Sequence, residues 1–359
     1  MIKLLKTLKK ADMISGPINT EALYRAIYLD SSSSLKDFST DRKKYHKKYI
    51  LNEVVEDEDS KAATMGRMVE TLLMEPHLFD ERFYLSTCMT TPTNLMLEFV
   101  EALYRHTVEA TSEEGLVTRS FEDLCRDAHA DSGFKIKLDA VLGKFIGSDA
   151  EIYYKEIREV RPRNLTVVTT QEIANAEKIV LELKTNPVTA EIVNTTSDAQ
   201  YSVYNQLQIE GYDVFNHKFK SMIDKMIVDH KARTVQVYDL KCTWSVENFY
   251  SEYYLYRRAY IQGYLYWNAA EAWAREHGYG DYEILYPKFI VCDSTSYSNP
   301  LIYSMTEDSI TKAVNGFEYK GREYPGVNPL ITDLTWALAN DKWNISRENH
   351  INNGIVNID

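Results

Sequence analysis

Residues 217–243 read HKFKSMIDKMIVDHKARTVQVYDLKCT, and this stretch decides the fold. Residues 217–229 and 234–243 are rich in alternating or β-branched apolar residues, and the polar sequence HKAR at 230–233 separates them. This pattern predicts two antiparallel strands joined as a β-hairpin. The sheet of the protein is therefore expected to be built around this hairpin.

Three charged residues interrupt the apolar runs of the hairpin: Asp224 in the first strand, and Asp239 and Lys241 in the second. Residues two apart in a strand share a face, so Asp239 and Lys241 point the same way, with Asp224 opposite them. Charge is unusual within so apolar a strand. Two carboxylates and one amine are expected to converge at a sheet edge; the competing interpretation is a surface salt bridge on an edge strand.

This trio suits the hydrolysis of a phosphodiester bond. Hard oxygen ligands hold Mg²⁺, which keeps several waters and takes further ligands from a substrate phosphate. The metal activates a water, and a neighbouring lysine orients or deprotonates it. Other acidic-x-Lys triplets occur, but Glu182-Leu-Lys184 lies in a stretch that predicts a helix, where its two charges face apart. The pattern therefore favours Asp224, Asp239 and Lys241 as the catalytic site.

Two more pairs of residues extend the candidate site. Glu70 follows Gly66 by one helical turn and is a candidate third carboxylate ligand. Gln262 and Tyr266 are one turn apart on a predicted long helix, share a face, and could line the active-site cleft. The competing interpretations are a solvated helix glutamate and an aromatic core stripe, since the chain has 26 tyrosines.

Helices are predicted before the hairpin, and helices and strands after it. The predicted helices cover 34–50, 60–74, 92–130, 170–183, 246–276 and 306–314, and further strands cover 283–292 and 301–305. This order predicts an α/β fold with a central mixed β-sheet flanked by helices, plus an N-terminal helical region. Residues 1–165 form that helical region, 166–340 the catalytic core and 341–359 a polar tail, together one compact unit.

The charge of the chain limits how it could bind nucleic acid. The formal net charge of −12 argues against wholesale coating of nucleic acid but permits a local DNA groove. Residues 36–48 are locally basic, and this segment has two interpretations, a solvated helix face or a DNA-backbone contact. The candidate DNA-binding residues are Lys43, Lys44, Arg257 and Arg258.

The four cysteines are widely scattered, which supports neither a zinc site nor a disulfide framework. Residues 1–10, MIKLLKTLKK, lack the uninterrupted apolar run of a signal peptide. No stretch approaches the roughly 18 apolar residues of a membrane span. A cytoplasmic protein without membrane contact is expected.

The order of these motifs resembles the PD-(D/E)XK nuclease superfamily, in its RecB-like branch, and within it exonucleases of the exonuclease VIII (RecE) type. The likeness covers roughly residues 31–315. Its elements are S-x-x-L-x-x-F at 32–38, GRMVETLLMEPHLFDERF at 66–83, the lone Asp224, DLKCT at 239–243 and Q-x-x-x-Y at 262–266. Each motif alone is weak, but the order and spacing together are fairly specific.

The resemblance implies a restriction-endonuclease-like core and a two-metal mechanism. It implies Mg²⁺, with Mn²⁺ as a substitute, held by Asp224, Asp239 and the Leu240 carbonyl, and Lys241 as the catalytic lysine. It also implies 5′-to-3′ resection of duplex DNA in phage or prophage recombination, in a bacterial host cytoplasm. A single-strand annealing protein is the implied partner, and a homo-oligomer is expected because relatives often form rings around DNA.

The sequence departs from the family pattern at three positions. Glu70 stands where many relatives have histidine, which leaves metal binding open but puts the metal preference in doubt. Gln200 falls near a position where relatives often carry glutamate, which weakens the case for a second metal. Asp41 stands at the position of the first cysteine of the iron–sulfur relatives, so no cluster is expected.

Two other functions remain open at this point. One is a structure-specific or nicking endonuclease on the same fold. The other is a catalytically inactive DNA-binding recombination module, although such proteins usually lose the lysine or one aspartate. The sequence leaves polarity and strand preference undecided, and residues 92–165 carry no motif with a known role.

Overall fold

The computed structural model describes residues 14–17, 21–53, 61–90, 92–163 and 165–356, so the lysine-rich residues 1–10 lie outside it. The chain forms two compact units, Met1–Gly66 with Ile179–Asp359, and Arg67–Lys178. These bounds differ from the regions expected from the sequence, which were 1–165, 166–340 and 341–359. No helix among the described residues is long and apolar enough to cross a membrane.

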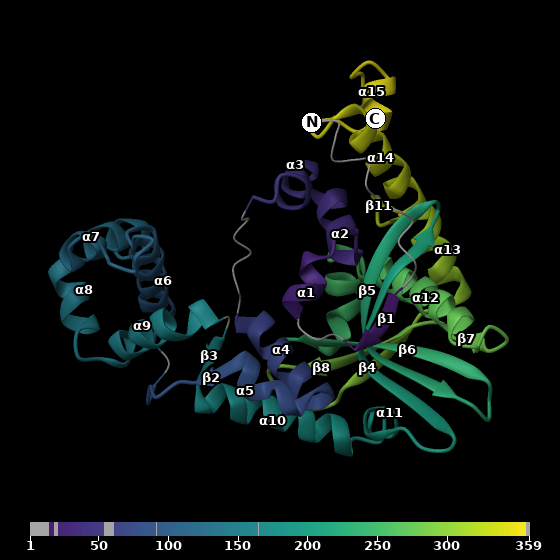
Figure 1. Cartoon of the computed structure of the whole chain (residues 1–359), viewed down its shortest axis with the longest axis horizontal. Coiled ribbons are helices and arrows are strands. Elements are labelled where there is room, and N and C mark those ends of the chain that lie inside the picture. The colour runs from purple at the N-terminus through teal and green to yellow at the C-terminus, as the bar shows by residue number, and fades with distance from the viewer. Residues whose placement is uncertain (1–13, 18–20, 54–60, 91, 164, 357–359) are drawn as a thin grey trace. The chain divides into compact units, whose positions relative to one another are not determined.

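Within the described ranges, the first unit is built on a seven-stranded mixed sheet (Figure 1). Its strands are β1 (Ile14–Pro17), β4 (Tyr201–Val214), β5 (His217–Asp229), β6 (Thr234–Thr243), β7 (Glu283–Ile284), β8 (Lys288–Asp293) and β9 (Leu301–Ser304). They lie in the order β1-β4-β5-β6-β8-β9, and β7 also pairs with β6. β6 is parallel to β7 and β8, and the other neighbours are antiparallel. The predicted α/β fold with a central mixed sheet is confirmed.

The predicted hairpin is present with its predicted bounds. β5 and β6 pair antiparallel, and the Asp229 carboxylate accepts the backbone N–H groups of Lys231 and Ala232 at 2.8 and 2.9 Å in the connecting turn. The expectation that the second strand lies at a sheet edge is wrong, because β6 has β5 on one side and β8 on the other. The apolar residues 289–292 of β8 are fully buried and satisfy their backbone groups by pairing with β6.

Parallel β6 and β8 are joined through a helix, α12 (Ala259–Glu276), as this connection requires. The prediction of one continuous helix over 246–276 is wrong in its first part. Residues 246–248 form a 3₁₀ turn and 250–256 a π-helix, and Arg258 then adopts a left-handed backbone with φ of 55°. The Arg258 guanidinium donates to the hydroxyls of Ser39 and Thr40, and these contacts favour the break in the helix.

The remaining elements of the first unit surround this sheet. They are α1 (Glu21–Ala26), α2 (Ser32–Thr40), α3 (Arg42–Tyr45), a π-helical turn (His46–Ile50), α11 (Ala190–Asn194), α13 (Glu307–Asn315), the hairpin β10 (Gly316–Tyr319) and β11 (Arg322–Pro325), α14 (Val327–Asn340) and α15 (Arg347–Ile351). The predicted helix over 34–50 is divided at Asp41, whose side chain caps α3. α15 lies within the predicted polar tail.

The two faces of the sheet are covered by different elements. α12 packs on the face to which Asp239 points, since Gln262 on this helix hydrogen-bonds to that carboxylate. Lys225 follows Asp224 and therefore points to the opposite face, where its Nζ donates to the Thr195 carbonyl just after α11 at 3.2 Å. The candidate residues thus lie between the sheet and α12.

The second unit is mainly helical. Its elements are the end of α4 (Lys61–Met74), a 3₁₀ turn (Pro76–Leu78), α5 (Phe79–Arg82), β2 (Phe83–Leu85), α6 (Asn94–Glu109), α7 (Phe121–Asp131), α8 (Leu138–Phe145), α9 (Asp149–Val160), a 3₁₀ turn (Arg161–Arg163), β3 (Thr166–Val168) and the start of α10 (Thr170–Thr185). The predicted helix over 92–130 is divided by a non-helical loop at 110–120. Fully buried Phe99, Leu103 and Phe145 anchor this unit's own core.

Candidate active site

Asp224 and Asp239 lie beside each other on β5 and β6. The last registered pair of these strands is Lys225 with Tyr238, and the two aspartates are the next residues along. Both are buried, with 8% and 2% of their surface exposed. Asp224 Oδ2 accepts a hydrogen bond of 2.7 Å from the backbone N–H of Leu240. The regular strand pairing is therefore replaced here by a contact between a carboxylate and the neighbouring backbone.

Lys241 shares a face of β6 with Asp239, as the strand alternation predicts. Its ammonium pairs with Asp239 Oδ2, and its Nζ also donates to the Leu240 carbonyl at 3.3 Å. The Lys241 side chain is 20% exposed, whereas that of Asp239 is 2% exposed. Of this pair, the lysine is the group that solvent reaches.

Gln262 and Tyr266 extend the cluster from α12. The Gln262 amide nitrogen donates to Asp239 Oδ1 at 2.8 Å and to the Tyr266 hydroxyl at 2.9 Å. Burial and the negative charges of Asp224 and Asp239 hold the pKa of Tyr266 well above its usual value, so its hydroxyl stays protonated. The structure brings together the predicted residues of the hairpin and of the Q-x-x-x-Y helix.

The sequence reasoning did not assign Lys36 to this cluster. Its Nζ donates to Gln262 Oε1 at 2.9 Å. Burial and the nearby Lys241 ammonium lower the pKa of Lys36 to about 7, against the opposing effect of Asp239. Its place inside the S-x-x-L-x-x-F motif at 32–38 was the available signal.

A second residue missed by the sequence reasoning is Gln206. The β4–β5 pairing runs to Asn205 opposite Lys225 and resumes at Leu207 opposite Ile223, so Gln206 is the β4 residue at the level of Asp224, where the regular pairing is interrupted. Gln206 is buried and has a φ of 50°, a left-handed backbone that is rare for a non-glycine residue. Residues held in such sparsely populated backbone conformations cluster at active sites.

The donor set suits a hard divalent cation. Asp224, Asp239 and the Leu240 carbonyl offer oxygen ligands, and buried Asp239 Oδ2 is met by the Lys241 ammonium as an ion pair without a regular hydrogen bond from any described residue. Within the described part of the chain, no group of three or more His, Cys, Asp or Glu side chains could hold a metal. Mg²⁺ does not require one, because it is usually bound through one or two carboxylates together with waters and substrate phosphates. The residues present therefore fit Mg²⁺ or Mn²⁺.

Two further positions noted in the sequence lie outside the contacts described so far. Glu70 lies on the part of α4 that belongs to the second unit, and its role as a metal ligand stays a prediction. Gln200 directly precedes β4, where its amide donates to Asp229 at 3.3 Å. Gln206, and not Gln200, is the residue opposite Asp224 in the β4–β5 register.

The four candidate DNA-binding residues occupy the surface of the first unit. Lys43 is exposed, and Lys44 Nζ lies 3.4 Å from an oxygen of Asp37. Arg257 is exposed, and its guanidinium lies 4.5 Å from the centre of the Tyr253 ring. Arg258 is held by α2, as described above. Their contacts with DNA stay predictions.

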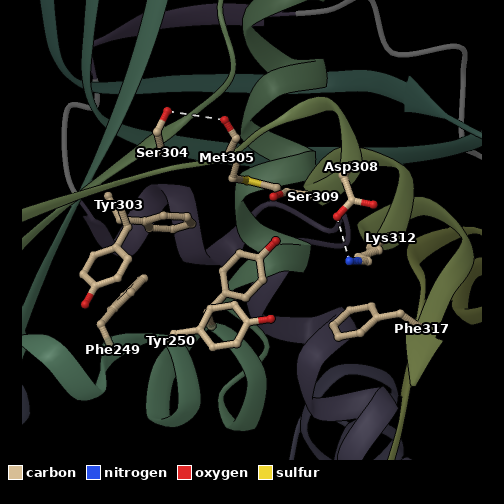
Figure 2. Close-up of a pocket in the computed structure, with 11 residues that line it drawn as sticks. Phe249, Tyr250, Tyr303, Ser304, Met305, Asp308, Ser309, Lys312 and Phe317 are labelled. Carbon is tan, nitrogen blue, oxygen red and sulfur yellow. Dashed lines mark hydrogen bonds and ion pairs between the residues drawn. The ribbon is translucent and has the colours of Figure 1, made fainter. Parts of the chain in front are cut away.

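A cavity in the first unit contains none of these residues in its lining (Figure 2). Aromatic rings surround it, among them Phe249, Tyr250 and Phe317, and an ion pair of 2.6 Å between Asp308 and Lys312 stands at its side. The chemistry of a phosphodiester needs oxygen ligands and cations, which this cavity does not concentrate. The charged cluster between the sheet and α12 is the candidate active site.

Comparisons with known proteins include a distant likeness to a solved structure. No family model and no curated protein matches the chain. A solved structure from Eubacterium rectale, described as “Putative exonuclease”, aligns with a TM-score of 0.46 and 12% identity over 95% of this chain and 89% of that chain.

Proposed function

We propose that this chain is a metal-dependent deoxyribonuclease that removes nucleotides from DNA ends. The observation that carries the proposal is the pair of buried aspartates, Asp224 and Asp239, on neighbouring strands with the Lys241 ammonium against one of them. Moving a charged side chain from water into the protein interior raises the free energy of folding by roughly several kcal/mol, unless partners or ligands offset this penalty. A surface salt bridge does not account for an aspartate that is 2% exposed in the middle of a sheet.

Asp224, Asp239 and the Leu240 carbonyl would hold Mg²⁺, with Mn²⁺ as a substitute. A bound Mg²⁺ would supply Lewis-acid activation of the phosphodiester and of the attacking water. The hydrogen bond from the Leu240 N–H to Asp224 fixes this part of the backbone, and the Leu240 carbonyl lies within the same cluster, 3.3 Å from Lys241 Nζ. Glu70 is proposed as a further ligand, as the G-x-x-x-E motif suggests.

The chain's own residues would orient the reactants. The partly exposed Lys241 ammonium would donate hydrogen bonds to the attacking water or to oxygens that gain negative charge. Gln262 holds Asp239 Oδ1, and protonated Tyr266 supports Gln262 from the next turn of α12. Lys43, Lys44, Arg257 and Arg258 are proposed to contact the DNA backbone, a local role that a net charge of −12 permits.

The resemblance to RecE-type exonucleases supports the finer assignment. On that basis the proposed activity is 5′-to-3′ resection of duplex DNA during phage or prophage recombination, in the host cytoplasm. The same resemblance supports a single-strand annealing protein as partner and a homo-oligomer around DNA.

The experiment that tests this function is digestion of DNA labelled at the 5′ or 3′ end, with Mg²⁺ or Mn²⁺. We expect early loss of the 5′ label from linear duplex, no cutting of covalently closed circles, and no activity with chelator. Cutting of closed circles would favour the endonuclease alternative and contradict an exonuclease. DNA binding without metal binding in calorimetry, and without digestion, would favour the inactive DNA-binding module.

A further inference from the structure

Lys36, Gln262 and Asp239 form a continuous chain of hydrogen bonds from α2 through α12 to β6. Lys36 Nζ donates to Gln262 Oε1 at 2.9 Å, and Gln262 Nε2 donates to Asp239 Oδ1 at 2.8 Å. Lys36 and Gln262 are 226 residues apart in the sequence, so the chain exists only in the folded protein.

The direction of this chain follows from the chemistry of its members. Below its pKa of about 7, Lys36 is an ammonium with three donors and no acceptor, whereas a glutamine amide has an acceptor oxygen and a donor nitrogen. Lys36 can therefore face only Oε1, which turns the Nε2 donors toward Asp239. In the flipped amide, Oε1 would lie against the Asp239 carboxylate and repel it. The ammonium of Lys36 thus favours the one amide orientation that supports the aspartate.

The helix that carries Lys36 is firmly placed. Ser31 and Ser34 form a reciprocal capping box at its start, with hydrogen bonds of 2.8 and 3.3 Å. Leu35 and Phe38 are 0% and 1% exposed, so α2 is anchored in the core on either side of Lys36. The Lys36 ammonium is consequently delivered to Gln262 by a rigid element and not by a loop.

The two oxygens of Asp239 have separate partners. Oδ1 accepts from Gln262, and Oδ2 pairs with Lys241. Two partners on two oxygens fix the plane of a carboxylate, and groups that orient a metal ligand in this way commonly change metal affinity or activity when they are removed. Lys36 does not contact Asp239 through this chain directly; it acts on Asp239 through its hydrogen bond to Gln262.

We propose that Lys36 is a positioning residue, which locks the Gln262 amide and thereby orients Asp239 for metal binding. The proposal rests on the proposed function for its catalytic consequence. It competes with the interpretation of residues 36–48 as a DNA-backbone contact. A backbone contact would weaken DNA binding and lower its salt dependence, whereas a positioning residue acts on the metal and on kcat.

The test is a double-mutant cycle on the full chain, with Lys36→Met, Gln262→Ala and the double variant. Lys36→Arg keeps the cationic donor, and Lys231→Met removes an exposed lysine from the β5–β6 turn as a control. The readouts are the Mn²⁺ Kd from calorimetry, kcat and KM on linear DNA, and the thermal unfolding midpoint.

We expect Lys36→Met to weaken Mn²⁺ binding and to lower kcat by about ten-fold each, with KM for DNA unchanged. The double variant should lose no more than Gln262→Ala alone, and Lys36→Arg should recover most of the loss. The sign of the metal effect, measured below pH 7 where Lys36 is an ammonium, is decisive, because removing a positive charge without any loss of positioning would tighten Mn²⁺ binding. Tighter or unchanged Mn²⁺ binding, or multiplied losses in the double variant, would overturn the proposal.

A wild-type protein that neither binds Mn²⁺ nor digests DNA would refute the proposed function, and the inference would still be open to test. The NMR signals of the Gln262 side-chain amide report its hydrogen bonds without metal or substrate. We expect these signals to shift, and their exchange with water to accelerate, in Lys36→Met but not in Lys231→Met. Identical signals in wild type and Lys36→Met would overturn the inference.

Discussion

Asp224 has two roles that can be tested separately: it accepts a backbone hydrogen bond, and it is proposed to bind the metal. Its Oδ2 accepts the Leu240 N–H at 2.7 Å in a buried position. Asp224→Asn keeps an acceptor oxygen of similar shape, whereas Asp224→Ala leaves the N–H unpaired. Both variants remove one negative charge, so the electrostatic change cancels in the difference between their free energies of unfolding. What remains is about 1–3 kcal/mol for a buried, unsatisfied N–H.

We therefore expect Asp224→Ala to unfold with a free energy about 1–3 kcal/mol below that of Asp224→Asn. Both variants should lose metal-dependent DNA hydrolysis, because neither offers a carboxylate. Urea unfolding in chelator measures the free energies, and equal slopes against urea show that the two proteins expose the same surface. Equal free energies for the two variants would refute the hydrogen-bond reasoning. Hydrolysis at the wild-type rate in Asp224→Asn would refute the ligand role.

Three further predictions concern the rest of the first unit. Gly263→Ala adds a methyl group that overlaps the Met305 sulfur; overpacking costs about 1–3 kcal/mol and the gain in helix propensity is at most about 1, so chemical denaturation should show a net loss. Burial lowers the pKa of Lys225 from 10.5 to about 8, so between these values the unfolded chain binds more protons and the free energy of unfolding rises with pH. Urea unfolding at pH 7, 9 and 10 should show this rise in wild type, and a flat profile would contradict it; Lys225→Met should reduce the rise, to which Lys36 and Lys220 also contribute, and stabilise the protein at pH 7. Lys43→Ala should lower the salt dependence of DNA binding by about one ion without changing the Mn²⁺ Kd, as measured by titrations at several salt concentrations.

The hairpin could be predicted because its signals are local. Alternation and a four-residue polar turn determine β5 and β6 within one short stretch. β4 could not be predicted in the same way, because YSVYNQLQIEGYDV places polar residues in both phases of the strand and carries an irregularity at Gln206. Its strand conformation depends on pairing with β5 along most of its length. The break before α12 likewise depends on the contacts of Arg258 with α2.

The residues of the candidate site also fall into two groups: those that local spacing could predict and one that depends on tertiary packing. The spacing of Asp239 and Lys241 places them on one face of a strand, and the spacing of Gln262 and Tyr266 places them on one face of a helix, whatever the tertiary structure. Lys36 joins them only because α2 packs beside α12, a contact between distant parts of the chain. The expected convergence at a sheet edge was wrong because β6 pairs with β8, whose residues follow more than 40 positions later in the sequence. In the folded protein, both aspartates are buried and the partly exposed Lys241 ammonium pairs with Asp239.

The most direct test of the nuclease site is the rate of Mg²⁺-dependent hydrolysis of linear duplex DNA by three proteins: wild type, Lys241→Ala and Lys231→Ala. Lys241 pairs with Asp239 in the site, whereas Lys231 is exposed in the turn of the same hairpin. Groups that position or transfer protons contribute about 10²–10⁴-fold to such rates. We predict rapid hydrolysis by wild type and Lys231→Ala, and a loss of at least about 100-fold in Lys241→Ala. Equal hydrolysis by Lys241→Ala and wild type, or none by wild type under any metal, would contradict the proposed site.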